Sequence, residues 1–399
     1  MLPLDKQHSF EQHPFVIDRH LEQWIRDIRR HIHTFPELSF EEHRTAAYVQ
    51  EKLKEIGIDS RGQVAGTGVV ASLSGPSSRI QGVALRADMD ALPVSEETGL
   101  RFSSQIPGVM HACGHDGHVA MLLGAAALLR SRDLPGPVTL IFQPAEEHGN
   151  GAWHMVNNGV LNNVGAVFAG HIDTHFPVGT MTIDEGIVCA WADPFEIRLS
   201  GKSGHAARPH EAVDAVVAAS NLVLSVQTLI SRGVDPNRSA VITIGAMQAG
   251  TAQNIIARDA LLQGTVRSTH CHTRKATLDG LQRVVESIGR MHGVAATLEF
   301  RNAIAAVENN AECVEYARKA AQAIEGDIVV TSQGAPSLGA EDFAFYQQHK
   351  PGCMVRFGGA SAQYGGIAHS GSFAFDEDVL AIGASWYANV AWQWLCRSF

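Results

Sequence analysis

Residues 137–147 read Pro-Val-Thr-Leu-Ile-Phe-Gln-Pro-Ala-Glu-Glu. The apolar run at the start of this stretch is typical of a parallel strand that is buried on both faces of a sheet. Residues 164–173 repeat the pattern, because an apolar run there ends in Gly-His-Ile-Asp. Strands that alternate with helices predict an open α/β sheet, in which ligands bind beyond the carboxyl ends of the strands.

A second stretch, residues 110–118, reads Met-His-Ala-Cys-Gly-His-Asp-Gly-His. The residues that follow, 119–129, are almost all Ala, Leu, Met and Gly, which predicts a buried helix with Asp116 capping its N-terminus. A Cys and a His two positions apart at the start of a buried helix can offer a thiolate and an imidazole to a metal ion. The alternative is a reduced Cys beside solvated histidines on a loop.

The composition excludes several classes of protein. A hydrophobic share of 45% and a charged share of 18% are typical of a globular protein, and 399 residues suffice for two domains. The net charge of −10 without a basic cluster argues against nucleic acid or an anionic membrane as a partner. Residues 1–20 contain no apolar core of a secretory signal, and no apolar run approaches the roughly 20 residues that span a bilayer. The six scattered cysteines predict reduced thiols in a cytoplasmic protein.

The character of the sequence changes near residue 186. From there to about residue 300 the expected elements follow the order β-α-β-β-α-β, which is typical of a two-layer, ferredoxin-like α+β domain. The chain then returns to its first pattern. We therefore expect a discontinuous catalytic domain, residues 1–186 and 301–399, built on a mixed open sheet with helices on both faces. An inserted α+β domain would occupy residues 187–300.

The candidate catalytic residues lie at the expected strand ends and in nearby loops; they are Cys113, His115, Glu146, Glu147, His171 and His369. Two adjacent carboxylates point in different directions, so one can bind a metal ion while the other faces a bound water. Metal-assisted hydrolysis requires this arrangement, because the carboxylate takes a proton from water and passes it to the leaving amine. Taken alone, the Glu pair is also compatible with two solvated loop charges.

The number of candidate ligands favours a pair of metal ions. Five N, O and S ligands exceed the needs of one tetrahedral site, and paired ions in hydrolases lie roughly 3.5–4 Å apart. Cys113 as a thiolate could bridge the two. A mixed Cys, His and carboxylate site suits Zn²⁺, Mn²⁺ or Co²⁺.

Several longer motifs occur in order along the chain; they are residues 86–93 (Arg-Ala-Asp-Met-Asp-Ala-Leu-Pro), 110–118, 143–147, 204–210 (Gly-His-Ala-Ala-Arg-Pro-His), 264–268 (Gly-Thr-Val-Arg-Ser) and 340–343 (Ala-Glu-Asp-Phe). In these motifs the sequence resembles the peptidase M20 clan. The resemblance is to its amidohydrolase branch of hippurate hydrolases, N-acyl-amino-acid amidohydrolases and auxin-conjugate hydrolases.

The resemblance implies a role for each candidate residue. Five of them would be ligands of two divalent metal ions: Cys113, His115, Glu147, His171 and His369. Glu146 would be the general base and acid, and Asp90 would support the ligands from outside the metal site. The inserted domain would be a lid and a dimerisation surface, which predicts a homodimer and allows a tetramer.

Two residues of the inserted domain are further candidates. By the resemblance, His205 would reach an active site, often that of the partner subunit, and stabilise the carbonyl oxygen as it gains negative charge. The alternative is a solvated loop His. Asn254 resembles a lid contact to the substrate carboxylate, although Ala257 stands where the related sequences frequently have Pro.

The predicted reaction is metal-dependent hydrolysis of an N-acyl amino acid, either hippurate-like or N-acetylated, to a carboxylic acid and a free amino acid. A dipeptidase or aminoacylase of the same clan differs mainly in the group on the substrate nitrogen. A thiol hydrolase with Cys113 as nucleophile would leave Glu146, Glu147 and His369 without a role. A catalytically silent metal-binding or metabolite-binding protein would lack the base, and the presence of Glu146 counts against it.

Overall fold

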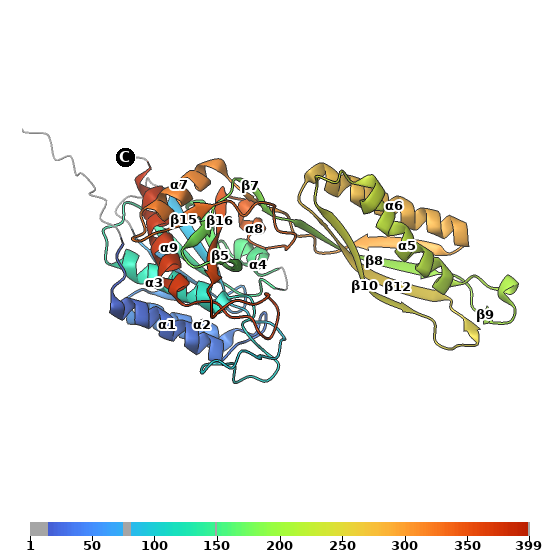
Figure 1. Ribbon diagram of the computed structural model, residues 1–399, viewed down its shortest axis with the longest axis horizontal. Helices are drawn as coiled ribbons and strands as arrows, with labels where there is room; N and C mark the ends of the chain where they lie inside the picture. The colour runs from blue at the N-terminus through green and yellow to red at the C-terminus, as the bar shows by residue number, and fades with distance from the viewer. Residues whose placement is uncertain (1–14, 75–80, 148–149, 398–399) are drawn as a thin grey trace, which may run out of the picture.

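The structure is a computed structural model that describes residues 15–74, 81–147 and 150–397. Part of the segment in which no secretory signal is expected, residues 1–14, lies outside the described residues. The chain forms a large lobe and a small lobe joined by a narrow connection (Figure 1). The large lobe contains the main sheet, and the small lobe runs from β8 (Trp191–Ser200) to β13 (Ala295–Phe300).

The main sheet has the strand order β1-β2-β4-β3-β5-β16-β6-β15. Strands β4, β3, β5 and β16 run parallel to one another, and β1 and β2 pair in the antiparallel sense; β6 is antiparallel to β16 and parallel to β15. The bounds are β1 Ser60–Val64, β2 Gly68–Leu73, β3 Gly82–Asp88, β4 Val138–Gln143, β5 Val164–Pro177, β6 Thr180–Thr182, β15 Val329–Thr331 and β16 Gly352–Ala360.

Helices cover both faces of this sheet, as the sequence predicts. Alternate residues of β3 point to opposite faces, so Val83 and Leu85 pack with α1, α2, α3, α7 and α9, while Ala84 packs with α4 and α8. The fold class predicted from the sequence is therefore confirmed. The helices are α1 Arg19–Thr34, α2 His43–Glu55, α3 His115–Arg130, α4 Gly151–Asn157, α7 Ala311–Gln322, α8 Ala344–Gln347 and α9 Asp378–Cys396.

The parallel strands bring their carboxyl ends to one edge. Asp88 at the end of β3 pairs with Gln143 at the end of β4, and Arg356 of β16 pairs with His171 of β5. The polar residues that follow each apolar run therefore meet at one side of the large lobe.

The expectation that Asp116 caps α3 is wrong. The N-cap residue is Gly114, whose φ of 93° lies in the left-handed region that glycine tolerates. The Asp116 carboxylate instead lies inside the first helical turn. It accepts hydrogen bonds from Arg29 Nε and His33 Nδ1, both at 2.8 Å, so it is held by distant residues of α1.

The small lobe is a four-stranded antiparallel sheet of order β10-β12-β8-β13, with α5 and α6 packed on it. Its strands are β8 Trp191–Ser200, β10 Ala240–Ala249, β12 Asp259–Ser268 and β13 Ala295–Phe300. Its helices are α5 Ala215–Gly233 and α6 Cys271–His292. A short two-stranded sheet, β9 Gly204–His205 with β11 Ile255–Ile256, lies at the outer end of this lobe (Figure 1).

Helix α5 differs from the expectation that no apolar run approaches membrane-spanning length. Its 19 residues are long and apolar enough by length and composition alone. One face, which includes Ala218 and Leu222, is buried against the small sheet, as in the core helix of a globular domain. Length and composition are therefore weak evidence for a membrane span here.

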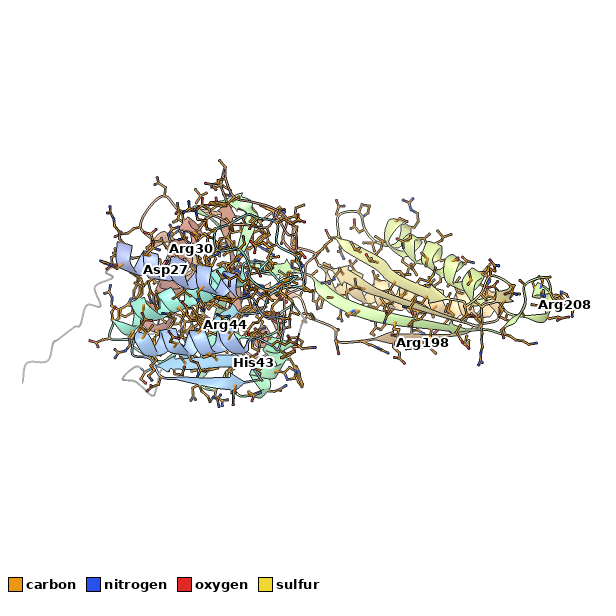
Figure 2. The ribbon with its side chains drawn as sticks, turned by 90° about the horizontal axis from the view of Figure 1, so that it is seen from below. Asp27, Arg30, His43, Arg44, Arg198 and Arg208 are labelled. Carbon is orange, nitrogen blue, oxygen red and sulfur yellow. The ribbon has the colours of Figure 1, made fainter. Side chains whose placement is uncertain are left out.

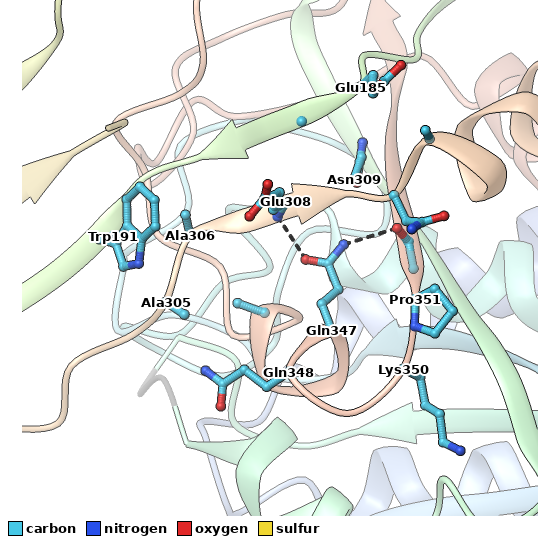
Figure 3. Close-up of a pocket in the computed structure, with 15 residues that line it drawn as sticks. Glu185, Trp191, Ala305, Ala306, Glu308, Asn309, Gln347, Gln348, Lys350 and Pro351 are labelled. Carbon is cyan, nitrogen blue, oxygen red and sulfur yellow. Dashed lines mark hydrogen bonds between the residues drawn. The ribbon is translucent and has the colours of Figure 1, made fainter. Parts of the chain in front are cut away.

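Two short strands, β7 Gly186–Cys189 and β14 Val307–Asn309, pair at the base of the connection between the lobes. A cavity of about 470 Å³ lies beside them (Figure 3). At its floor Gln347 accepts a hydrogen bond from Glu308 N at 2.9 Å and donates one to Gly352 O at 3.3 Å, which ties β14 to β16. The lining of this cavity includes no Cys or His.

Candidate active site

The candidate metal ligands converge at the carboxyl edge of the main sheet. The donor atoms of Cys113, His115 and His171 lie within 4.8 Å of one another, and so do those of Cys113, Glu147 and His369. The Cys113 sulfur therefore belongs to two sets of three donors. This geometry fits a thiolate that bridges two metal ions, each with further ligands of its own.

The tautomers of His115 and His171 leave their Nε2 atoms free to bind a metal ion. His171 Nδ1 lies 2.6 Å from the carbonyl of Ile172, and His115 Nδ1 lies 2.9 Å from the carbonyl of Asp90. Both Nδ1 atoms must donate to these carbonyls, so in the neutral form of each ring Nε2 carries a lone pair toward the cluster. Within the described part of the chain, His115 Nε2 is buried without a hydrogen-bond partner, and Glu147 Oε1 is buried with only His369 Nε2 nearby, at 3.3 Å. Orphaned acceptors of this kind fit metal ligands.

His118, the third histidine of the 110–118 stretch, has no free nitrogen. Its Nδ1 lies 2.6 Å from Asp88 Oδ1, and its Nε2 accepts a hydrogen bond from Ile172 N at 2.8 Å. The backbone donor fixes the tautomer, so His118 supports the site and cannot ligate a metal ion.

The charges at the cluster favour a cation. Hydrogen bonds to Cys113 and Glu147 raise the pKa of His369 to about 10. The same negative groups would stabilise a divalent ion in place of the proton. Burial, followed by the neighbouring His118 and Arg356, lowers the pKa of His171 well below its usual range, which keeps this ligand neutral.

Glu146 lies beside the metal ligands and among other carboxylates. Its carboxylate, His115 and Glu147 form one close group, and it forms another with Glu341 and Asp342. Burial and the charges of Glu341, Glu147 and Asp342 raise the pKa of Glu146 well above its usual range. A carboxylate with a raised pKa is a better proton acceptor near neutral pH, as a general base requires.

Asp90 holds the loop that carries both glutamates. Its Oδ1 accepts a hydrogen bond from Glu146 N and its Oδ2 accepts one from Glu147 N, each at 3.0 Å. Ser39 Oγ also donates to Oδ2, at 2.7 Å. The Asp90 carboxylate therefore fixes the backbone of two adjacent candidate residues, and the backbone carbonyl of Asp90 orients His115.

A buried charge network beneath the site was not singled out from the sequence. Arg86 is only 1% exposed, and its guanidinium donates to Asp88, Glu341, Asp342 and Gln143 at 2.7–3.0 Å. The network links the end of β3 to residues some 255 positions later in the chain. The signal that could have found it is the pair of charged residues, Arg86 and Asp88, at the end of the apolar run of β3.

The cluster opens into a cavity of about 940 Å³ between the lobes, which we call the main cavity. Glu146, Glu147 and His369 line its large-lobe side, and Arg267 of β12 lines its small-lobe side. Among the described residues, the Arg267 guanidinium has no hydrogen-bond partner, and it is only partly exposed. A cation placed in this way can bind an anionic group of a substrate.

The structure does not bring His205 or Asn254 to the cluster. His205 in β9 pairs with Ile255, next to Asn254, and neither residue lines the main cavity. Arg208 lies at the outer end of the small lobe (Figure 2); its backbone N–H donates to His205 O, and Ala206 N donates to Asn254 O. His205 is exposed, and its Nδ1 accepts a hydrogen bond from Ala207 N at 3.1 Å, so Nε2 is available.

The fold and the cluster define a hydrolase of the α/β class whose residues fit two metal ions. Residues 84–393 match the sequence model of peptidase family M20/M25/M40, and the chain belongs to this family. Membership makes it an enzyme of amide-bond hydrolysis, which confirms the resemblance found in the sequence.

Three similar proteins illustrate this membership. A thermostable carboxypeptidase of Saccharolobus solfataricus is 41% identical over 94% of this chain and 96% of its own length. An N-acetyl-L-cysteine deacetylase of Bacillus subtilis is 39% identical over 85% of this chain and 81% of its own length. A crystal structure of a dinuclear metal-binding M20 peptidase from Bacillus subtilis is 34% identical, with a TM-score of 0.82, over 94% of this chain and 98% of that one.

Proposed function

We propose that this enzyme hydrolyses the amide bond of N-acyl amino acids, such as hippurate or N-acetyl amino acids, with two divalent metal ions per subunit. The observation that carries the proposal is the Cys113 sulfur shared by two sets of donors, with the Glu146 carboxylate beside them. The deacetylase and the dinuclear peptidase described above support the reaction and the metal count. Mn²⁺, Zn²⁺ and Co²⁺ all suit the ligands.

The ligands in this proposal are Cys113, His115, Glu147, His171 and His369. Bound there, the ions would polarise the amide carbonyl and lower the pKa of a water molecule. Glu146 takes the proton from that water and delivers it to the leaving nitrogen, for which its raised pKa suits it. Asp90 holds Glu146 and Glu147 in position, because its carboxylate accepts hydrogen bonds from both of their backbone amides.

The main cavity supports an amino acid as the leaving half of the substrate. Every N-acyl amino acid carries an α-carboxylate close to the scissile bond. Arg267 offers an unpartnered guanidinium to such a group from the small lobe, across the cavity from Glu146. Asn254 would be a second contact if the small lobe of a partner subunit approached.

We further propose that residues 187–300 act as a lid and pair two subunits into a homodimer, with a tetramer as a possible larger assembly. Three apolar side chains on the outer face of α5 support this proposal, because Val216, Val217 and Leu224 are 40%, 51% and 72% exposed. The position of His205 supports it as well, since this residue belongs to β9 at the outer end of the small lobe (Figure 1) and does not line its own subunit's main cavity. In a dimer it would reach the partner's site and stabilise the carbonyl oxygen.

The cellular setting in this proposal is the cytoplasm. All six cysteines are unpaired, which fits a reducing compartment. The substrates are small molecules.

The test is hydrolysis of N-benzoyl-, N-acetyl- and dipeptide substrates, followed as release of the amino acid. Glu146→Ala should abolish turnover while metal stays bound, and the matched control Glu325→Ala, at an exposed site, should keep wild-type rates. Near-normal kcat in Glu146→Ala would refute the mechanism. Cleavage of dipeptides alone would instead show that the enzyme is a peptidase, as the name of the carboxypeptidase relative suggests.

A further inference from the structure

A second cavity, of about 430 Å³, lies next to the metal-ligand cluster, with His171 in its lining. We call it the side cavity. It shares four lining residues with the main cavity, which are His171, Ser337, Arg356 and Ala368. The two cavities therefore meet at His171, and a molecule whose reacting carbon sits at the cluster can extend into both.

The walls of the side cavity come from the large lobe alone and combine apolar side chains with polar ones. Phe176 and Ile172 of β5 line it, together with Phe373 and Ala335 from loops. Ile172 and Phe373 are each 2% exposed, so these walls are firmly packed. The volume falls within the roughly 300–1,000 Å³ of small-molecule pockets.

The one guanidinium in the side cavity is already neutralised. Arg356 Nη1 binds Asp173 Oδ2 at 3.1 Å, and its Nε binds Gln333 Oε1 at 3.0 Å. Its Nη2 lies 3.4 Å from Cys189 Sγ. Each nitrogen of the guanidinium has a protein partner, and Asp173 balances its charge.

The two cavities thus differ in charge. The main cavity adds Arg267, whose guanidinium has no hydrogen-bond partner among the described residues, whereas the guanidinium of the side cavity is that of Arg356, which is paired with Asp173. An N-acyl amino acid has an anionic half and an acyl half on opposite sides of the scissile amide. Burying a carboxylate against apolar walls without a free cation is costly, so the anionic half belongs in the main cavity.

We infer that the side cavity is the acyl-group subsite and that it takes an uncharged aromatic or medium-length acyl chain, with Phe176 as a specificity-determining residue. This inference rests on the proposed function. Phe176 and Ala335 are suitable probes because neither is a candidate metal ligand and neither is fully buried.

The experiment compares kcat/KM for N-acetyl-, N-hexanoyl- and N-benzoylglycine in two variants. Phe176→Ala removes an apolar wall and should lower kcat/KM for the hexanoyl and benzoyl substrates about 5- to 30-fold, with the acetyl substrate within about twofold. Ala335→Phe fills the cavity and should discriminate against the same two substrates. The control Phe300→Ala, the same change on β13 outside both cavities, should alter none of them.

Equal losses for all three acyl groups would overturn the assignment. Binding of the product acids gives a readout that does not need turnover. Calorimetry on metal-loaded protein should show that Phe176→Ala weakens benzoate about 5- to 30-fold and leaves acetate unchanged. If the wild type cleaves no N-acyl amino acid, the proposed function fails, while unchanged benzoate binding in Phe176→Ala refutes the subsite alone.

Discussion

Replacement of Asp90 by Asn tests how the site is held together. The carboxylate accepts from Glu146 N on one oxygen and from Glu147 N and Ser39 Oγ on the other. An amide has one acceptor oxygen, so in either orientation its NH₂ group faces a backbone N–H. The Ser39 hydroxyl can rotate to accept a hydrogen bond, but the backbone amide cannot. Asp90→Asn therefore leaves one buried N–H of the 146–147 segment without an acceptor.

The size of the effect follows from that lost partner. A buried donor without an acceptor costs about 1–3 kcal/mol, so the free energy of unfolding of chelator-treated Asp90→Asn should fall by about that amount. Loss of an outer support of metal ligands typically costs roughly 10- to 100-fold in metal affinity or activity. We expect Asp90→Asn to fall in this range for both, because Glu147 and Glu146 move together.

The assay combines urea unfolding of the chelator-treated protein with metal titration and kcat on the loaded protein. Ser39→Ala is the graded control, because it removes one hydrogen bond to Asp90 and leaves both backbone amides bound; it should cost about 1 kcal/mol. If Asp90→Asn kept metal affinity, kcat and stability within twofold or about 0.4 kcal/mol, the supporting role of Asp90 would be refuted.

Four further predictions address other parts of the molecule. Cys113→Ala should reduce bound metal measured by mass spectrometry, since both donor sets lose a member. Although burial raises the pKa of Glu96, hydrogen bonds from His33, Ser104 and Thr98 lower it to about 2. The Glu96 carboxylate thus adds stability above pH 4.5 that is lost as the pH falls toward 2, and Glu96→Gln should cost about 1–2 kcal/mol at pH 7 but little near pH 2. Leu224→Glu should convert a dimer to monomers in light scattering. Gly170→Ala should cost about 1–3 kcal/mol, because its Cβ would lie 2.1 Å from the Phe357 ring.

Each of these has a contradicting outcome. Full metal content in Cys113→Ala would remove the sulfur from the site. A constant stability difference between Glu96→Gln and wild type from pH 7 to pH 2 would show that the carboxylate charge does not matter. A Leu224→Glu protein with wild-type mass in solution would place any interface elsewhere. Wild-type stability in Gly170→Ala would show that the Phe357 ring can move aside without cost.

The sequence predicted the fold class because its apolar runs are long and regular. Local patterns at 137–142 and 164–169 are typical of buried strands, and parallel strands bring the residues after them to one edge. That rule alone places Glu146, Glu147 and His171 close together in space. The structure adds which nitrogen of each histidine is free, since this depends on neighbours such as the Ile172 carbonyl.

Contacts between distant segments account for what the sequence did not predict. Asp is a residue type that often caps helices, yet the Asp116 carboxylate instead accepts hydrogen bonds from Arg29 and His33, more than 80 positions away. The Arg86 network depends likewise on Glu341 and Asp342, whose proximity no local pattern reveals. His205 and Asn254 lie together at the outer end of the small lobe, so their roles stay predictions that depend on a second subunit.

The most direct test of the account is release of glycine from hippurate by chelator-treated protein, before and after addition of Mn²⁺ or Zn²⁺. For a metal-dependent amidohydrolase, the rate of glycine release should fall about tenfold or more on chelation and recover when metal is added. Activity that is unchanged by the chelator and lost on alkylation would contradict this account. It would point to Cys113 as a nucleophile paired with His171, whose Nε2 lies 3.4 Å from the sulfur.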